Sequence, residues 1–132
     1  MNYLIDACSL LSFFLGEKES DKMENILNMA NNNQTKLFMS LVNYGQVCMK
    51  FDQLLDEDEA KMKKEEIKTT LNITFLNLNL EITEQAAKLK SVGGLAYPDA
   101  FALATAKYHK LKLLTKDSEF KKFEGDFEIE WL

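Results

Sequence analysis

Three aspartates lie where an α/β chain can build a site for a divalent metal. Asp6 follows the apolar run at residues 3–5, Asp99 stands at the start of an apolar stretch with helical character, and Asp117 follows the run at residues 113–116. Carboxylates that gather in one place repel one another, and packing does not relieve that repulsion. A divalent cation bound among them would relieve it and would supply Lewis-acid chemistry. The three aspartates are therefore candidate metal ligands.

Each aspartate also has a plain structural explanation. An aspartate near the start of a helix is often a capping group, which applies to Asp99. An aspartate after a strand is often a turn former, which applies to Asp6 and Asp117. To account for all three aspartates, these explanations must hold together, which is less probable than any one of them alone. The sequence therefore favours a cluster of carboxylates, and the structural explanation stays open.

The elements that must position these residues alternate between strands and helices. Short apolar runs predict strands, and apolar residues spaced three and four apart predict helices. On this basis we expect strands at residues 1–5, 37–39, 73–78, 112–115 and 127–131. We expect helices at residues 8–15, 19–31, 40–55, 57–71, 82–91 and 98–109. Such alternation is typical of a parallel sheet that helices cover on both faces.

The topology of such a sheet would bring the aspartates together. Binding sites in open α/β sheets form beyond the carboxyl ends of the strands, and Asp6 and Asp117 each follow a strand. Asp99 opens the helix that leads into the fourth strand, and the start of a helix favours a carboxylate. Gln46 lies six residues after Ser40. That is roughly 9 Å along a helix at ~1.5 Å per residue, so its side chain would have to lean toward this edge.

The composition limits the class of protein. A chain of 132 residues with 46% apolar residues fits one globular domain that spans residues 1–132. The net charge is −5 and every strong cation is lysine, which argues against a nonspecific nucleic-acid binder without excluding a nuclease. No apolar run reaches the ~20 residues of a membrane span. The N-terminus also lacks the features of a signal peptide, so we expect a cytoplasmic protein.

Four segments around these residues resemble the PIN domain and, within it, the VapC-type toxin ribonucleases. They are residues 3–9 with Asp6 and Ser9, residues 40–47 with Gln46, residues 97–106 with Asp99, and residues 113–120 with Thr115 and Asp117. Each segment alone is a weak signal, but four in this order in a chain of fitting length are fairly specific. The likeness covers nearly the whole chain.

The resemblance implies a three-layer α/β/α sandwich with a mostly parallel central sheet of about four to five strands, which cuts RNA with Mg²⁺ or Mn²⁺. Asp6, Asp99 and Asp117 would hold the metal directly or through water, and Ser9 and Thr115 would donate hydrogen bonds that orient the carboxylates. VapC-type proteins usually form homodimers and are silenced by a cognate antitoxin protein. The implied substrate is RNA, with transfer RNA and ribosomal RNA both open.

Gln46 departs from the family pattern, whose four catalytic positions fall on Asp6, Gln46, Asp99 and Asp117 and which has glutamate at the second of them. Glutamine is nearly isosteric but neutral, so the site is one negative charge short and the residue cannot act as a base. Three explanations stay open. They are an engineered Glu→Gln change that suppresses toxicity, a naturally weakened or inactive member, and a position that is misaligned or dispensable. A chain without the chemistry would be a PIN-fold RNA- or protein-binding module.

Three further features have simple interpretations. Lys116, beside one of the aspartates, could approach a substrate phosphate but fits better as a solvated lysine. Phe13, Phe14 and Leu15 could form part of an antitoxin groove or a dimer face but fit better as part of the core. Cys8 and Cys48 lie in apolar stretches with helical character, and we expect them to be buried, reduced thiols.

Overall fold

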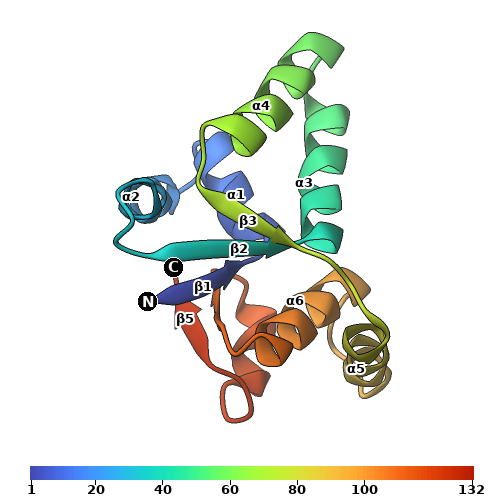
Figure 1. The fold of residues 1–132 in the computed structure, drawn as a ribbon. Helices are drawn as coiled ribbons and strands as arrows, with labels where there is room; N and C mark the ends of the chain where they lie inside the picture. The colour runs from blue at the N-terminus through green and yellow to red at the C-terminus, as the bar shows by residue number, and fades with distance from the viewer.

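A computed structural model describes all residues, 1–132, and is built around a five-stranded sheet (Figure 1). The strands are β1 (Asn2–Ile5), β2 (Lys36–Ser40), β3 (Ile73–Leu76), β4 (Lys112–Thr115) and β5 (Ile129–Trp131). They lie in the order β3-β2-β1-β4-β5, and every neighbouring pair is parallel. The first strand of the chain is therefore the central strand. The prediction of a mostly parallel sheet is confirmed.

Helices cover both faces of this sheet. One face is covered by α1 (Ala7–Phe14), α2 (Ser20–Asn31), α3 (Leu41–Leu54) and α4 (Glu57–Thr69), which lie above the sheet in Figure 1. The other face is covered by α5 (Leu80–Ser91) and α6 (Tyr97–Tyr108). A short 3₁₀ helix, η1 (Ser118–Phe123), follows β4. The three-layer α/β/α arrangement that the resemblance implied is confirmed.

Alternation along the strands divides the core into two apolar clusters. In β1, Leu4 packs among the buried side chains of α5 and α6, whereas Ile5 packs with those of α1 to α4. In β4, Leu113 and Leu114 divide in the same way. Successive side chains of a strand point to opposite faces, so strands that are apolar at both positions need cover on both faces. The sheet therefore separates two cores and contributes to each.

The helices that carry candidate residues begin in different ways. Asp6 precedes α1, and its Oδ1 accepts a hydrogen bond from the Ser9 backbone N–H at 2.9 Å. The Ser40 hydroxyl caps α3 in a similar manner. α6 has no side-chain cap, and Pro98 occupies its first turn, where the missing N–H of proline costs little. Asp99 lies in the same turn and forms no capping hydrogen bond.

Three expectations from the sequence need correction. The third strand ends at Leu76 rather than at residue 78, because residues 77–79 leave the sheet and Asn79 caps α5. The 3₁₀ helix η1 was not expected, since a segment of six residues is too short to show a helical period. Cys8 is exposed and Cys48 half-buried, because they lie away from the buried sides of α1 and α3; both are free thiols.

Phe13 and Phe14 pack against the core beneath α1 to α4, as the core interpretation predicts, whereas Leu15 is exposed and corrects that expectation. Both phenylalanines are half-buried and pack against that cluster. The Phe14 ring meets the ring of Phe51 edge to face, with centroids 5.3 Å apart. Aromatic pairs favour this geometry, so the contact helps to fix α1 against α3.

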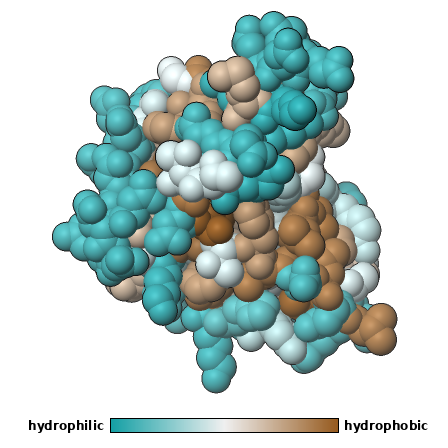
Figure 2. Space-filling view, turned by 45° about the horizontal axis from the view of Figure 1, so that its top comes forward, coloured by the Kyte–Doolittle hydropathy of each residue, from teal (hydrophilic) through white to brown (hydrophobic).

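The surface is mostly polar. Figure 2 shows hydrophilic side chains over the left and upper parts of one face, with apolar side chains gathered toward its lower right. Among the exposed large apolar residues are Met62, Leu80 and Val92. None of the helices combines the length and the apolar character that crossing a membrane requires.

A candidate metal centre at the carboxyl edge of the sheet

Three carboxylates meet beyond the carboxyl end of β4. Asp99 lies in the first turn of α6, Asp117 immediately precedes η1, and Glu119 lies in the first turn of η1. Each can offer one oxygen such that the three oxygens lie within 4.8 Å of one another. The sequence predicts that Asp99 and Asp117 lie at this edge, and in the structure their carboxylates come together.

Glu119 is not among the metal ligands predicted from the sequence. The only sequence signal for it is that it lies two positions after Asp117. Asp117 Oδ1 accepts a hydrogen bond from the Glu119 backbone N–H at 3.0 Å, which fixes a tight turn between the two residues. The carboxylates of both residues then reach the same place. An acidic residue two positions after a turn-forming aspartate was the signal that the sequence offered.

Asp6 lies behind this group rather than in it. Its side chain is buried, and both of its oxygens accept hydrogen bonds, Oδ1 from the Ser9 N–H at 2.9 Å and Oδ2 from the Thr115 hydroxyl. Asp6 is not among the three carboxylates within 4.8 Å of one another. It is near enough, however, for its charge to raise the pKa of Asp99.

Two hydroxyls tie the segments beneath the carboxylates together. Ser9 Oγ donates a hydrogen bond to the Leu114 carbonyl oxygen at 3.1 Å. Thr115 Oγ1 donates to Asp6 and accepts a hydrogen bond from the Asp117 N–H at 3.1 Å. Thr115 therefore sets the positions of Asp6 and Asp117 relative to each other.

Gln46 is joined to the site through Asn43. Its Oε1 accepts a hydrogen bond from Asn43 Nδ2 at 2.9 Å, and the same nitrogen donates to the Pro98 carbonyl oxygen at 3.2 Å, one residue before Asp99. Gln46 thus reaches the start of α6 without a direct hydrogen bond to an aspartate. Asn43 Oδ1 is buried and has no hydrogen-bond partner in the protein, so this corner holds an acceptor that a water molecule could satisfy.

Negative charge at this edge is not balanced by the protein. Burial, followed by the charges of Asp117, Asp6 and Glu119, raises the pKa of Asp99 to about 7. Burial raises the pKa of Asp6 as well, and the hydrogen bonds of that carboxyl offset the rise only in part. Clustered acids that resist ionisation are an unfavourable arrangement, and a bound cation reverses it by stabilising the charged forms.

Neighbouring side chains bring no positive charge to the cluster. Lys116 Nζ forms ion pairs with Glu19 at 3.2 Å and with Glu17 at 3.4 Å, so its charge is directed to the segment before α2. Cys8 is exposed as a residue, but its thiol is partly desolvated by its surroundings. This desolvation and then the charges of the three aspartates raise the pKa of the thiol to about 11. Cys8 remains a neutral thiol at physiological pH.

The structural explanations considered for the aspartates account for two of the three. Asp6 caps α1, and Asp117 caps η1. Asp99 caps no helix, because α6 begins after Ala96 without a side-chain cap. The start of α6 favours a carboxylate, but it does not explain why two further carboxylates lie beside Asp99, and a cation shared with Asp117 and Glu119 does.

The donor set fits a hard divalent cation. Asp99, Asp117 and Glu119 offer carboxylate oxygens only, with no histidine or thiol in the group, and Mg²⁺ and Mn²⁺ prefer such ligands. Oxygens on opposite sides of one ion lie ~4–5 Å apart. A group within 4.8 Å is therefore of the size that one ion can bridge.

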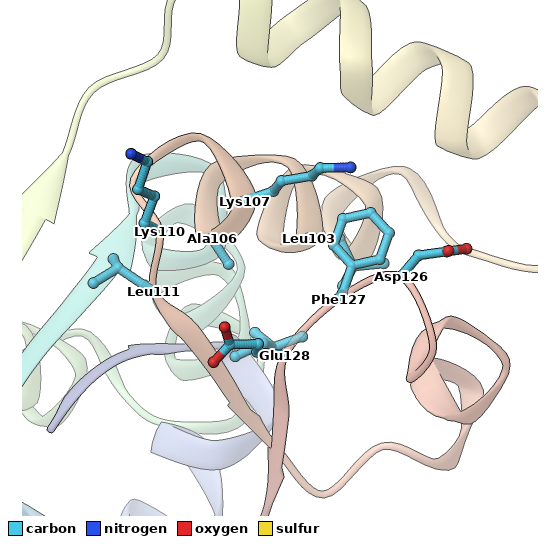
Figure 3. A pocket seen from close by; sticks show the side chains of 9 residues that line it. Leu103, Ala106, Lys107, Lys110, Leu111, Asp126, Phe127 and Glu128 are labelled. Atoms are coloured by element: carbon cyan, nitrogen blue, oxygen red, sulfur yellow. The ribbon is translucent and has the colours of Figure 1, made fainter.

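A surface hollow of about 190 Å³ lies at the other end of α6, against the segment before β5 (Figure 3). Lys107, Lys110 and Phe127 are among its lining residues, and Lys107 Nζ lies 5.1 Å from the centroid of the Phe127 ring. Asp99 lies at the beginning of α6, roughly 12 Å from Lys107 along a helix that rises ~1.5 Å per residue. The hollow shares no residue with the carboxylate cluster.

Comparisons with known proteins agree with this fold. The sequence pattern of the PIN domain matches residues 3–126 of the chain. A comparison with curated proteins gives no match.

Several solved structures are similar in fold. VapBC2 from Rickettsia felis, bound to a DNA fragment from its promoter, matches with a TM-score of 0.79 at 14% identity, over 99% of this chain and 98% of that chain. A toxin–antitoxin complex from Klebsiella pneumoniae matches with 0.69 at 23%, over 97% and 95%. VapC20 from Mycobacterium tuberculosis, described as a sarcin–ricin loop cleaving toxin, matches with 0.73 at 12%, over 95% of each. At such identities the likeness is one of fold.

Proposed function

This chain belongs to the PIN domain family, and from that premise we propose that it is a Mg²⁺- or Mn²⁺-dependent endoribonuclease, the toxin of a toxin–antitoxin pair. One observation carries the proposal: three carboxylates lie within 4.8 Å of one another at the carboxyl edge of the sheet. It is the one place in the chain where three such side chains come together.

The residues of the site have distinct tasks in this proposal. Asp99 and Asp117, with Asp6 behind them, would hold the cation directly or through water. When bound, the cation activates a water molecule and stabilises negative charge on the scissile phosphate. Thr115 holds Asp6 and Asp117 in place before substrate arrives, through the two hydrogen bonds of its hydroxyl. In the metal-free protein the pKa of Asp99 is raised to about 7, so near neutral pH a cation that binds to this carboxylate would have to displace its proton.

The similar structures support a substrate class and a partner. VapC20 is described as a toxin that cleaves the sarcin–ricin loop, and the Klebsiella pneumoniae structure is a toxin–antitoxin complex. For this chain we propose an RNA substrate, either transfer RNA or ribosomal RNA, and a cognate antitoxin protein. We also propose that it forms a homodimer and acts in the cytoplasm.

Gln46 favours a second candidate, an RNA- or protein-binding module that keeps the fold without the chemistry. Its side chain is neutral, and its Oε1 is already engaged by Asn43 at 2.9 Å. A neutral amide adds nothing to the charge that holds a hard cation.

Mn²⁺ binding separates the two candidates. In a calorimetric titration of the metal-free chain, a nuclease site binds Mn²⁺, and Asp99→Asn abolishes that binding because it removes a ligand charge. Mn²⁺-dependent cleavage of RNA should be lost in the same variant. If Asp99→Asn binds Mn²⁺ as the parent chain does, or if neither protein binds, the binding-module candidate moves ahead.

Gln46→Glu tests the departure at this position directly. Glutamate keeps an acceptor for Asn43 and adds one negative charge, so we expect tighter Mn²⁺ binding and faster Mn²⁺-dependent cleavage than in the parent chain. Equal binding and equal cleavage by the two proteins would show that position 46 does not contribute to the site.

A further inference from the structure

We propose that Glu119 supplies the metal site with the negative charge that Gln46 does not, so that the ligand set includes a carboxylate from η1. The inference rests on the proposed function, because it concerns the same cation. Glu119 lies in the fourth of the sequence segments, residues 113–120, but is not one of the four catalytic positions that the resemblance implies. This role for Glu119 predicts that the site binds a cation despite the neutral side chain of Gln46.

The position of Glu119 is the first argument. One of its carboxylate oxygens lies within 4.8 Å of an oxygen of both Asp99 and Asp117. The backbone N–H of Glu119 donates to Asp117 Oδ1 at 3.0 Å, so the two residues are held in one turn. Their relative placement therefore does not depend on the long side chain of Glu119 alone.

The second argument is that the Glu119 carboxylate has no other partner. It takes part in none of the ion pairs of the structure and accepts no side-chain hydrogen bond. The two lysines that follow it in η1 do not pair with it, and Lys122 donates instead to the Gly93 carbonyl oxygen at 3.3 Å. An unpaired carboxylate beside two other acids is destabilising unless a cation joins them.

The third argument comes from position 46. Gln46 Oε1 accepts a hydrogen bond from Asn43, and Asn43 in turn donates to Pro98 at the start of α6. The glutamine thus holds a local hydrogen-bond chain, which a neutral side chain can do as well as a charged one. The charge itself must come from elsewhere, and Glu119 is the carboxylate that joins Asp99 and Asp117.

The test is a calorimetric Mn²⁺ titration of the metal-free chain and its variants. Glu119→Gln should weaken Mn²⁺ binding by about ten-fold or more, the scale of loss that follows removal of a group that supports a bound metal. Glu128→Gln is the matched control, since it removes the same charge from an exposed glutamate that lies by the hollow at the other end of α6. The control should bind Mn²⁺ as the parent chain does.

A compensating variant sharpens the result. If Glu119 stands in for the charge missing at position 46, Gln46→Glu should restore Mn²⁺ binding to the Glu119→Gln chain. Glu119 is exposed, so its substitution should leave the far-UV circular dichroism spectrum of the metal-free protein unchanged. The thermal midpoint of the metal-free protein should not fall, since the substitution removes a like charge from beside Asp99 and Asp117. This separates a lost ligand from a lost fold.

Each outcome has one meaning. Weak binding by Glu119→Gln with normal binding by Glu128→Gln supports the role of Glu119. Normal binding by Glu119→Gln, with binding abolished in Asp99→Asn, overturns that role while the proposed nuclease site stands. No binding by the parent chain overturns both the metal site and the role of Glu119 in it.

Discussion

At the scale of single residues, the environment of Asp99 sets the chemistry of the cluster. Its carboxyl is half-buried, and the charges of Asp117, Asp6 and Glu119 act on it. Burial and like charge both favour the neutral form of an acid. The pKa of Asp99 is accordingly raised to about 7, whereas a free aspartate titrates near ~3.9. Without metal, the protein carries a carboxyl that changes charge in the neutral range.

Asp99 should make the stability of the metal-free protein depend on pH. The folded state binds this proton more tightly than the unfolded chain, so the contribution of Asp99 to the free energy of unfolding falls as pH rises from about 4 to about 7. Asp99→Asn, which mimics the protonated acid, should therefore be more stable than the parent chain at pH 8, and the difference should shrink toward pH 4. Urea unfolding in a chelator measures both proteins, and a difference that does not change with pH would contradict this.

The sequence predicts where in the fold the residues of the candidate site lie, but not which way their side chains point. Asp6, Asp99 and Asp117 stand at the ends or starts of elements, and the topology of a parallel sheet fixes where those ends meet. The last few ångströms depend on hydrogen bonds that spacing does not reveal. A hydrogen bond from Thr115 holds the Asp6 side chain beneath the carboxylate cluster. A tight turn after Asp117 places the Glu119 carboxylate within the cluster.

At the scale of elements, Thr115 links the end of the central strand β1 to the start of η1 through hydrogen bonds. Its hydroxyl donates to Asp6, directly after β1, and accepts from the N–H of Asp117, directly before η1. Thr115 itself ends β4, which pairs with β1. One buried hydroxyl thus satisfies a buried carboxylate and a backbone donor.

Thr115→Val should destabilise the protein and weaken the metal site. Valine has nearly the same shape but cannot form either hydrogen bond, so the free energy of unfolding should fall by about 1–3 kcal/mol. Thr115→Ser keeps the hydroxyl and loses only a methyl group, which costs about 1 kcal/mol. Urea unfolding and Mn²⁺ titration of the two variants should therefore differ, with Mn²⁺ affinity kept by serine and reduced by valine. Equal losses in both would mean that Thr115 acts through packing alone.

Most elements could be predicted because their patterns are local, whereas their pairing could not. A short apolar run identifies β1 and β4, and repeats of three and four identify the longer helices. That Leu4 lies opposite both Phe38 and Leu113 is set by segments far away in the sequence. The early end of β3 is also set by tertiary structure. Residues 77–79 alternate between asparagine and leucine as a strand would, but they connect β3 to α5 instead.

At the scale of the whole molecule, one sheet serves two cores. Phe51 is fully buried on the side of α1 to α4, and Leu103 is fully buried on the side of α5 and α6. Leu4 and Ile5, next to each other in β1, belong to different sides. Because neither core can lose its strands without the other losing them too, we expect residues 1–132 to unfold as the single domain that the length predicts.

Phe51→Ala tests that cooperation across the sheet. Loss of a buried aromatic side chain should lower the free energy of unfolding by about 3–5 kcal/mol. Trp131 reports on the opposite side, because it packs against the cluster beneath α5 and α6. Its fluorescence should follow the same shifted transition as far-UV circular dichroism. A fluorescence midpoint that stays at the parent value would show that the two sides unfold separately.

The order of the strands also constrains when the protein can act during its synthesis. A ribosome makes β1 first, yet β4, its partner in the middle of the sheet, is made only after all six α-helices. Asp6 and Thr115, which share a hydrogen bond, are separated by 109 positions. A growing chain that ends before Asp117 lacks both Asp117 and Glu119 and cannot assemble the acidic centre. We therefore expect translation products that stop before residue 117 to lack the proposed activity.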